Sequence, residues 1–286
     1  MAICRPVEFT KKLLNTPNEA AEIKRVCLGE MEYLRKSYKT ASSLRNGCTV
    51  YRNHFREVMK KENSRTIEVV LEKASKHFRL TSKQRMNVRK AYENKITGRQ
   101  HNLRHISDVD GYIFKSEELL SATSYIDRLL GLCALTGRRS AEILTSAKFT
   151  VAGEDLFFEG QLKTKGRGDI GGYQIPVLTD PEVVVEGVAR MRKERPDLVG
   201  NPPLAHTRTS KILSVKVKTH YQEYLGEKVI VRDLRRAYGT LAYVLNDKRF
   251  EVAKQRYISD ILGHGATDRV TGGSYVDFEV TDPSYI

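Results

Sequence analysis

The chain has 286 residues, of which 40% are hydrophobic, enough to bury the core of one large domain or two ordinary ones. Its net charge of +14 favours a polyanionic partner. Residues 1–100 hold 23 Lys and Arg against 10 Asp and Glu, whereas residues 101–286 hold 26 against 25. A basic module before a nearly neutral one is typical of a nucleic-acid clamp joined to a catalytic body.

Composition disfavours membrane and disulfide-stabilised proteins. No apolar run approaches the roughly 18 residues of a membrane span, and residues 1–6 lack the apolar core of a signal peptide. A basic membrane-surface segment is disfavoured because the apolar residues are spread through several helical patterns. Since the cysteines show neither CxxC spacing nor a zinc-finger offset to a His, we expect a cytoplasmic protein with reduced thiols. These cysteines are Cys4, Cys27, Cys48 and Cys133.

Residues 7–100 are predicted to be mostly helical. Asn18 is placed to cap a long helix, and Asn46-Gly47 is expected to break the helical run before a second helix over residues 51–60. The first of these helices carries an apolar stripe at helical spacing. The stripe consists of Ile23, Cys27, Leu28, Met31 and Leu34.

Two further basic helices are predicted. Ser64 is placed to cap the third helix, and Thr81-Ser82 the fourth, which is expected to end at Thr97-Gly98. For any single lysine of the fourth helix a solvated helix face is the simpler interpretation, but as a set its cations indicate phosphate contacts. The set is Lys83, Arg85, Arg89 and Lys90.

A linker is predicted from Thr97 to Asp110, which divides the chain into a helical basic DNA-binding domain (residues 1–103) and a second domain (residues 104–286). In the second domain, residues 119–135 form an apolar helical pattern. Residues 156–165 and 173–178 are expected to form two strands of an antiparallel hairpin. Further helices are predicted over residues 181–193, 209–225, 234–245 and 250–262.

Five short boxes of the second domain suggest phosphodiester chemistry. Cleaving a phosphodiester without a metal ion requires a nucleophile, fixed positive charge beside the phosphorus oxygens and an acid for the leaving oxygen. Arg suits the second task because its planar fork grips two oxygens and stays protonated, and Lys suits the third. We find no compact Asp, Glu and His cluster with metal-ligand spacing, which disfavours a metal-dependent nuclease.

In order, these boxes resemble the tyrosine recombinase (phage integrase) family over about residues 104–280. Thr136-Gly137-Arg138-Arg139-Ser140-Ala141-Glu142 resembles the T-G-x-R-x-x-E box around the first catalytic Arg. Gln161-Leu162-Lys163-Thr164 resembles the strand of the catalytic Lys, and Arg232-Asp233-Leu234-Arg235-Arg236 the H-x-L-R-R box. Leu262-Gly263-His264 matches the L-G-H box, and Tyr275, eleven positions later, matches the nucleophile.

The resemblance implies a mainly α fold with a small antiparallel β-hairpin or sheet, and a type IB mechanism. Tyr275 would attack the scissile phosphate, forming a 3′-phosphotyrosyl link and releasing a 5′-hydroxyl. Arg139, Arg235 and His264 would hold the non-bridging oxygens, and Lys163 would protonate the departing oxygen. No metal or nucleotide cofactor would be required, because the covalent link conserves the bond energy.

Two departures from the family pattern point to one branch of it. Arg232 replaces the His of the H-x-L-R-R box, and since it cannot act as a base it can only bind phosphate or order the site. The interval from His264 to Tyr275 is longer than is usual in integrases. Both departures, and the basic helical N-terminal module, resemble telomere resolvases (protelomerases), which make covalently closed hairpin DNA ends. An integrase and a catalytically inactive DNA-binding protein are the alternatives.

The branch also implies partners. We expect double-stranded DNA with a palindromic site, bound by a homodimer without a membrane partner, in the nucleoid of a prokaryotic or phage system. Within the boxes, Glu142 is expected to orient Arg139. Arg138 and Arg236 are alternatives to their neighbours as phosphate ligands, and Lys165, on the same strand face, is the alternative to Lys163.

Overall fold

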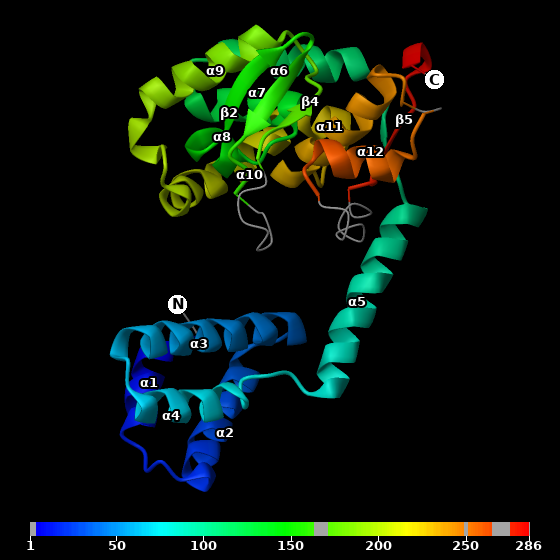
Figure 1. Cartoon of the computed structure of the whole chain (residues 1–286). Coiled ribbons are helices and arrows are strands. Elements are labelled where there is room, and N and C mark those ends of the chain that lie inside the picture. Colours follow the sequence, from blue (N-terminus) through cyan, green and yellow to red (C-terminus); the bar gives the residue numbers. More distant parts are fainter. Residues whose placement is uncertain (1–3, 163–170, 249–250, 265–274, 286) are drawn as a thin grey trace. The chain divides into compact units, whose positions relative to one another are not determined.

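The computed structural model describes residues 4–162, 171–248, 251–264 and 275–285 (Figure 1). The chain divides into two compact units, Met1–Lys95 and Ile96–Ile286, called here the N-terminal unit and the C-terminal unit. The division falls inside one helix, α5 (Ser82–His101).

The predicted linker from Thr97 to Asp110 is wrong. α5 continues to His101, with the Asn102 side chain donating to Gly98 O over 2.8 Å, and Gly98 therefore does not end it. β1 (Arg104–Ile106) follows and pairs with β5 (Phe278–Val280), about 170 residues further along the chain. A partner so distant in sequence leaves no local signal, so the sequence of this segment alone predicts a linker.

Four helices precede α5 in the described part of the N-terminal unit, and the core of this unit is aromatic. Phe9, Tyr51, Phe55 and Phe78 are buried and touch one another, with the rings of Tyr51 and Phe78 stacked at a centroid distance of 4.7 Å. Such pairs add to the hydrophobic stabilisation of their burial. The helices are α1 (Pro6–Leu14), α2 (Ala20–Ser37), α3 (Ala41–Glu62) and α4 (Arg65–Ser75).

The apolar stripe of α2 was predicted correctly except at one position. Leu28 is 45% exposed, because it lies one residue past Cys27 and about 100° away from the buried stripe around the helix. The predicted cap Asn18 does not cap α2; its side chain accepts from Lys73 Nζ over 3.2 Å. Likewise Ser64 precedes α4 but makes no side-chain cap hydrogen bond.

α3 runs without interruption through Asn46-Gly47, where a break was predicted. The reason for the glycine is packing: a Cβ at Gly47 would lie 2.6 Å from the Tyr38 ring, so only glycine permits this close approach. α5 begins as predicted, since Thr81 Oγ1 accepts from Gln84 N over 3.2 Å and Gln84 Oε1 accepts from Thr81 N over 3.0 Å, a reciprocal cap.

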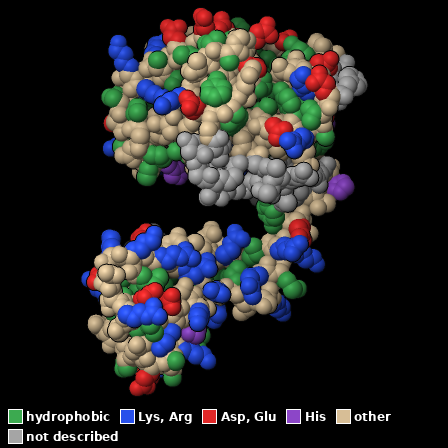
Figure 2. Space-filling model, viewed as in Figure 1, with side chains coloured by type: hydrophobic (Ala, Val, Ile, Leu, Met, Phe, Trp, Pro, Cys, Tyr) green, Lys and Arg blue, Asp and Glu red, His purple; other side chains and the backbone are tan. Residues whose placement is uncertain are grey.

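Cations cover the N-terminal unit on the face that Figure 2 shows. α5 has no buried side chain among those described, and its Lys83, Arg85 and Lys90 are exposed and pair with no described carboxylate. A helix that is polar all round draws no stability from a core-facing stripe. The surface of this unit therefore suits contact with a polyanion.

α7 (Tyr125–Thr136) is the centre of the C-terminal unit (Figure 1). Every residue from Ile126 to Thr136 is buried, because five helices surround it. The single helix predicted over residues 119–135 is in fact two, and Arg128 holds the turn between them by donating to Thr123 O over 2.9 Å. The surrounding helices are α6 (Val109–Ser121), α8 (Ser140–Thr145), α9 (Pro181–Glu194), α10 (Pro202–Leu225) and α11 (Val231–Leu245).

A three-stranded antiparallel sheet completes this unit, in the order β2 (Lys148–Ala152), β3 (Asp155–Glu159) and β4 (Tyr173–Ile175). The predicted hairpin corresponds to β3 and β4, but β3 ends earlier than predicted, at Glu159, and Gly160 follows it with φ +88°. β2 was not predicted. The fold class, mainly α with a small antiparallel sheet, is confirmed.

The last helices were predicted with inexact starts. α10 begins seven residues before the predicted start, because prolines suit a first helical turn and Asn201 Oδ1 caps it by accepting from Leu204 N over 3.2 Å. Pro202 and Pro203, read as loop residues, belong to that turn. α12 (Lys254–Ile261) begins after the predicted start at residue 250. None of the helices in the described ranges combines the length and apolarity needed to cross a membrane.

The aromatic core generates a stability prediction for the N-terminal unit. Phe55→Ala removes a ring with no exposed surface and is expected to lower the free energy of unfolding of this unit by about 3–5 kcal/mol, because a cavity is left behind. Hydrogen exchange of the full chain in urea, read on peptides from residues 4–95, measures the change. Val50→Ala, on the exposed side of the same helix, should change it by less than about 0.5 kcal/mol. Equal effects of the two substitutions would contradict this account of the core.

Candidate active site

The first box forms the tight connection between α7 and α8. Gly137 ends α7 with φ +64°, and a Cβ there would lie 2.1 Å from the Tyr238 ring, so the turn requires glycine. Arg139 follows as the N-cap residue of α8, and its backbone N–H donates to Glu142 Oε2 over 3.0 Å. The Arg139 guanidinium pairs with the same carboxylate, which is fully buried. This arrangement holds the guanidinium in one place.

Arg235, from α11, lies at the centre of the site and is 4% exposed. Its Nη2 donates to Leu262 O over 2.8 Å and its Nη1 to Gly137 O over 2.5 Å. Burial, with the like charges of Arg138 and Arg139, lowers the pKa of Arg235 to about 10, so it stays protonated near neutral pH.

Tyr275 lies against these cations and is 8% exposed. Its ring centroid is 5.7 Å from Arg235 Cζ and 5.0 Å from the centroid of the His264 ring. Burial opposes ionisation of the phenol, but Arg235 and Arg139, followed by a smaller effect of Arg232, bring its pKa below the ordinary value of 10.0. The hydroxyl therefore lies in the field of the guanidinium groups.

Of the other predicted site residues, His264 and Arg232 are described by the structure and Lys163 is not. His264 directly follows the turn after α12, where its backbone N–H donates to Ser259 O over 2.8 Å. Arg232 is exposed on the first turn of α11. Lys163 and its alternative Lys165 lie outside the described residues. The structure thus brings together Tyr275 with Arg139, Arg235, His264 and Arg232.

The charge balance of the site leaves an excess of positive charge. Burial tends to raise the pKa of Glu142, yet Arg235, Arg139 and Arg138 together hold it below the ordinary value of 4.5. One carboxylate thus faces several guanidinium groups. Fixed positive charge in a buried site stabilises an anion such as a phosphate, and more so the extra charge of its transition state.

A hydrogen-bonded relay that the motifs did not predict joins three of the boxes. Arg138, 1% exposed, donates to Tyr173 Oη over 2.7 Å and to Ile261 O over 2.6 Å. The Tyr173 hydroxyl donates to Gln161 Oε1 over 2.5 Å, and Gln161 Nε2 donates to Gly263 O over 3.1 Å. Arg138 therefore has a structural position, not that of an anion ligand. In the sequence, its position next to Arg139 is the only feature that indicates a role for Arg138.

The relay explains why the L-G-H box contains glycine. Gly263 has φ +67°, and a Cβ there would lie 2.1 Å from Gln161 Oε1 and 2.2 Å from Tyr173 Oη. The backbone before His264 is thus in direct contact with the segment before Lys163. Gly263 is required both for its conformation and for this close approach.

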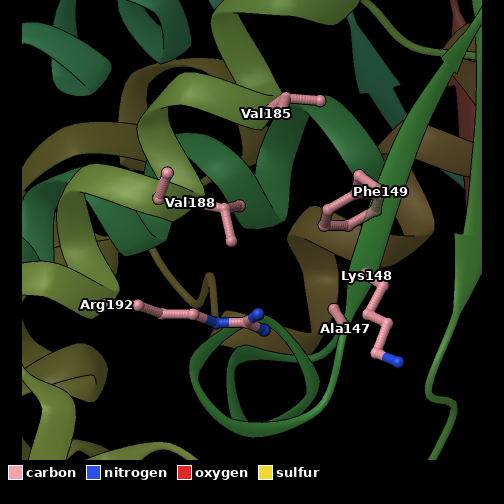
Figure 3. Close-up of a pocket in the computed structure, with 7 residues that line it drawn as sticks. Ala147, Lys148, Phe149, Val185, Val188 and Arg192 are labelled. Atoms are coloured by element: carbon pink, nitrogen blue, oxygen red, sulfur yellow. The ribbon is translucent and has the colours of Figure 1, made fainter.

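A separate pocket lies between α9 and β2, apart from these residues (Figure 3). Its volume is about 210 Å³, and Arg192 borders it while donating to Ile143 O over 2.8 Å. None of the candidate site residues lines it. Among the described residues, no group of three or more His, Cys, Asp or Glu side chains is arranged to hold a metal ion.

Sequence comparisons place the C-terminal unit in one family. The sequence model described as the telomere resolvase ResT/TelK catalytic domain matches residues 102–278. The protelomerase of Klebsiella oxytoca phage phiKO2 is 23% identical over 231 residues, which cover 72% of this chain and 36% of the phage protein. The chain therefore spans about a third of the length of this curated relative.

Structural comparisons agree on the fold. Protelomerase TelA covalently complexed with substrate DNA is similar with a TM-score of 0.80 and 21% identity, covering 96% of this chain and 87% of that one. A TelA mutant complexed with a DNA hairpin product gives 0.81 at the same identity and coverage. Protelomerase TelK complexed with substrate DNA gives 0.59 and 19%, covering 93% and 60%. At these identities the likeness establishes the fold.

The buried carboxylate generates a prediction about pH. Because the folded-state pKa of Glu142 is lowered, its ionised form contributes stability that is complete above about pH 5 and is lost as the pH falls through that lowered value. Glu142→Gln should therefore lower the free energy of unfolding by about 3–5 kcal/mol near pH 7. The difference in the free energy of unfolding between this variant and the native protein should become smaller as the pH falls below 4.5. Denaturant titrations across this range, with the exposed Glu154→Gln as control, measure it; a gap that widens in acid would refute the assignment.

Proposed function

The chain belongs to the telomere resolvase family, and we propose that it cleaves and rejoins double-stranded DNA to produce covalently closed hairpin ends. The observation that carries this proposal is the burial of the Tyr275 phenol beside Arg139, Arg235 and His264. The names of the similar solved structures support it, since TelA has been captured covalently bound to substrate DNA and with a hairpin product.

In the proposed first step, Tyr275 Oη attacks the scissile phosphorus in line with the departing 5′-oxygen. The phenol loses its proton to water, a bond forms between phosphorus and the phenolic oxygen, and the bond to the 5′-oxygen breaks, leaving a 3′-phosphotyrosyl link. Arg139, Arg235 and His264 stabilise the charge that develops on the non-bridging oxygens. Lys163 donates a proton to the 5′-oxygen, which leaves as a hydroxyl.

In the second step, the 5′-hydroxyl attacks the phosphotyrosyl phosphorus of the opposite strand of the same duplex and returns its proton to Lys163. The bond to Tyr275 breaks, the phenolate takes a proton from water, the phosphodiester is restored and a hairpin is sealed. Because each step exchanges one phosphate ester for another, bond energy is conserved and no nucleotide cofactor is consumed. This is the chemistry of a type IB strand transferase.

We further propose a division of labour between the two parts of the chain. Residues 1–103 supply a basic helical DNA-binding domain, and residues 104–286 supply the catalytic domain. The exposed cations of α5 and of the N-terminal unit support the first assignment. A palindromic site would be bound by two copies of the chain, since a two-fold DNA site matches a two-fold protein dimer.

The proposal can be tested without knowing the DNA target. Supercoiled plasmids carrying a library of randomised inverted repeats are incubated with the protein in EDTA, and exonucleases then remove every open DNA end. Hairpin-ended linear plasmids are expected to survive, to snap back on a denaturing gel and to reveal the site on sequencing. Tyr275→Phe should abolish both these products and any covalent protein–DNA adduct, because the nucleophile is lost.

The other outcomes identify the alternatives. Plasmids joined to one another with exchanged strands would indicate an integrase. DNA binding without an adduct would indicate a DNA-binding protein that has lost catalysis. Either result would overturn the proposed hairpin-forming activity.

The basic helix α5 generates a separate prediction. If Lys83, Arg85 and Lys90 each neutralise a phosphate, replacing all three by Gln should make binding less sensitive to salt. The negative slope of the logarithm of the association constant against the logarithm of the salt concentration should become shallower by about 2.7. Titrations of a fluorescent plasmid-derived duplex at several salt concentrations measure this slope. Lys248→Gln, whose amine already pairs with Glu251 at 2.7 Å, is the control and should leave it nearly unchanged. An unaltered slope in the triple variant would exclude α5 from the DNA contact.

A further inference from the structure

A chain of buried ion pairs connects the start of α11 to the segment that carries Tyr275. Arg236 Nη1 lies 2.8 Å from Asp233 Oδ1 and 3.1 Å from Asp277 Oδ2. Arg104 Nη1 lies 2.8 Å from the other oxygen of Asp233. The side chains of Arg236, Asp233 and Asp277 are 4%, 2% and 5% exposed, so these three charges are almost entirely removed from water, whereas Arg104 is 33% exposed.

The same residues hold the strand that follows Tyr275. The backbone N–H of Arg104 donates to Asp277 O over 2.9 Å, at the start of the parallel pairing between β1 and β5. Arg104 Cζ also lies 4.1 Å above the Phe278 ring. Strand pairing, a cation–π contact and ion pairs therefore converge on the two residues Asp277 and Phe278.

Consecutive residues of α11 serve two different contacts. Arg235 lies 5.7 Å from the Tyr275 ring centroid, whereas Arg236 turns to Asp277, two residues after Tyr275. Rotation by about 100° per residue separates the two side chains around the helix. The helix that presents a guanidinium to the phenol is thus bonded to the segment that presents the phenol.

We propose that Arg236 and Asp277 are positioning residues that fix the Tyr275 phenol relative to the Arg235 guanidinium. A buried ion pair adds little net stability compared with apolar residues of similar size, so its main consequence here is the geometry that it imposes. Displacing a reacting group by about 1 Å can reduce a rate about 10²-fold. The role in catalysis rests on the proposed function, but the positioning itself can be measured without DNA.

The first experiment places 3-fluorotyrosine at position 275 of the full chain and titrates it by ¹⁹F NMR. Asp277→Ala removes a negative charge, which by direct electrostatics alone would lower the pKa of the phenol or leave it unchanged. Loss of positioning instead moves the phenol away from the cations and should raise that pKa by about one unit. The sign of the shift therefore separates positioning from a direct charge effect.

Glu279→Ala is the matched control on the same strand. This substitution breaks the ion pair between Glu279, which is 46% exposed, and Lys254 Nζ at 2.6 Å. It should leave the pKa of the phenol at position 275 unchanged. If Asp277→Ala does not fold, the isosteric Asp277→Asn takes its place and the same rise, although smaller, is expected. An unchanged or lowered pKa in the folded variant overturns the proposal, whatever the chain does to DNA.

The second experiment measures single-turnover cleavage of the duplex recovered from the plasmid library. Asp277→Ala should slow cleavage about 10²-fold while leaving the dissociation constant for DNA nearly unchanged. The double variant Arg236→Gln, Asp277→Ala should cleave no more slowly than the slower of the two single variants, because both substitutions break the same contact between Arg236 and Asp277. Additive losses would overturn the proposed pairing. Absence of cleavage by the native chain would refute the proposed function and leave the titration to decide the positioning.

Discussion

Attraction between one buried carboxylate and several guanidinium groups is the interaction on which the candidate active site depends. Arg138 and Arg139 disfavour the charge of the buried Arg235, and Glu142 opposes this repulsion. In a medium of low polarity such charges interact strongly, so the cluster holds together only because the carboxylate stays ionised. Glu142 leaves part of the positive charge uncompensated, as the proposed binding of a phosphate requires.

Two glycine turns supply the remaining support for the cluster. The carbonyl of Gly137 and the carbonyl just before Gly263 both accept hydrogen bonds from Arg235. Each glycine has a positive φ and lies where a Cβ would collide with a tyrosine. The backbone of both turns can therefore approach the guanidinium closely and satisfy it without adding a second carboxylate. The positive charge of Arg235 is thereby held in place but not neutralised.

The sequence predicted those parts of the site that depend on residue type and chain order. Box resemblance was enough to select the family, and it named Arg139, Arg235 and Tyr275 as candidates, which the fold brings together. What it could not predict depends on partners far away in the chain. The pairing of β1 with β5 and the relay through Tyr173 join segments that lie far apart in the chain. Nothing in the local sequence of one segment indicates that the other is its partner. Gly47, read as a helix breaker, is explained only by the ring of Tyr38 against it.

Under the proposed mechanism, the arginine at position 232 changes how the Tyr275 phenol would lose its proton. An imidazole in its place could accept that proton, whereas a guanidinium cannot. Arg232 instead contributes to lowering the pKa of Tyr275, although less than Arg235 and Arg139 do. Under the proposed mechanism, a more acidic phenol offsets the missing base, since more of it is ionised at neutral pH. Because Arg232 is exposed, this part of the site borders solvent, and the proposed mechanism would pass the proton to water there.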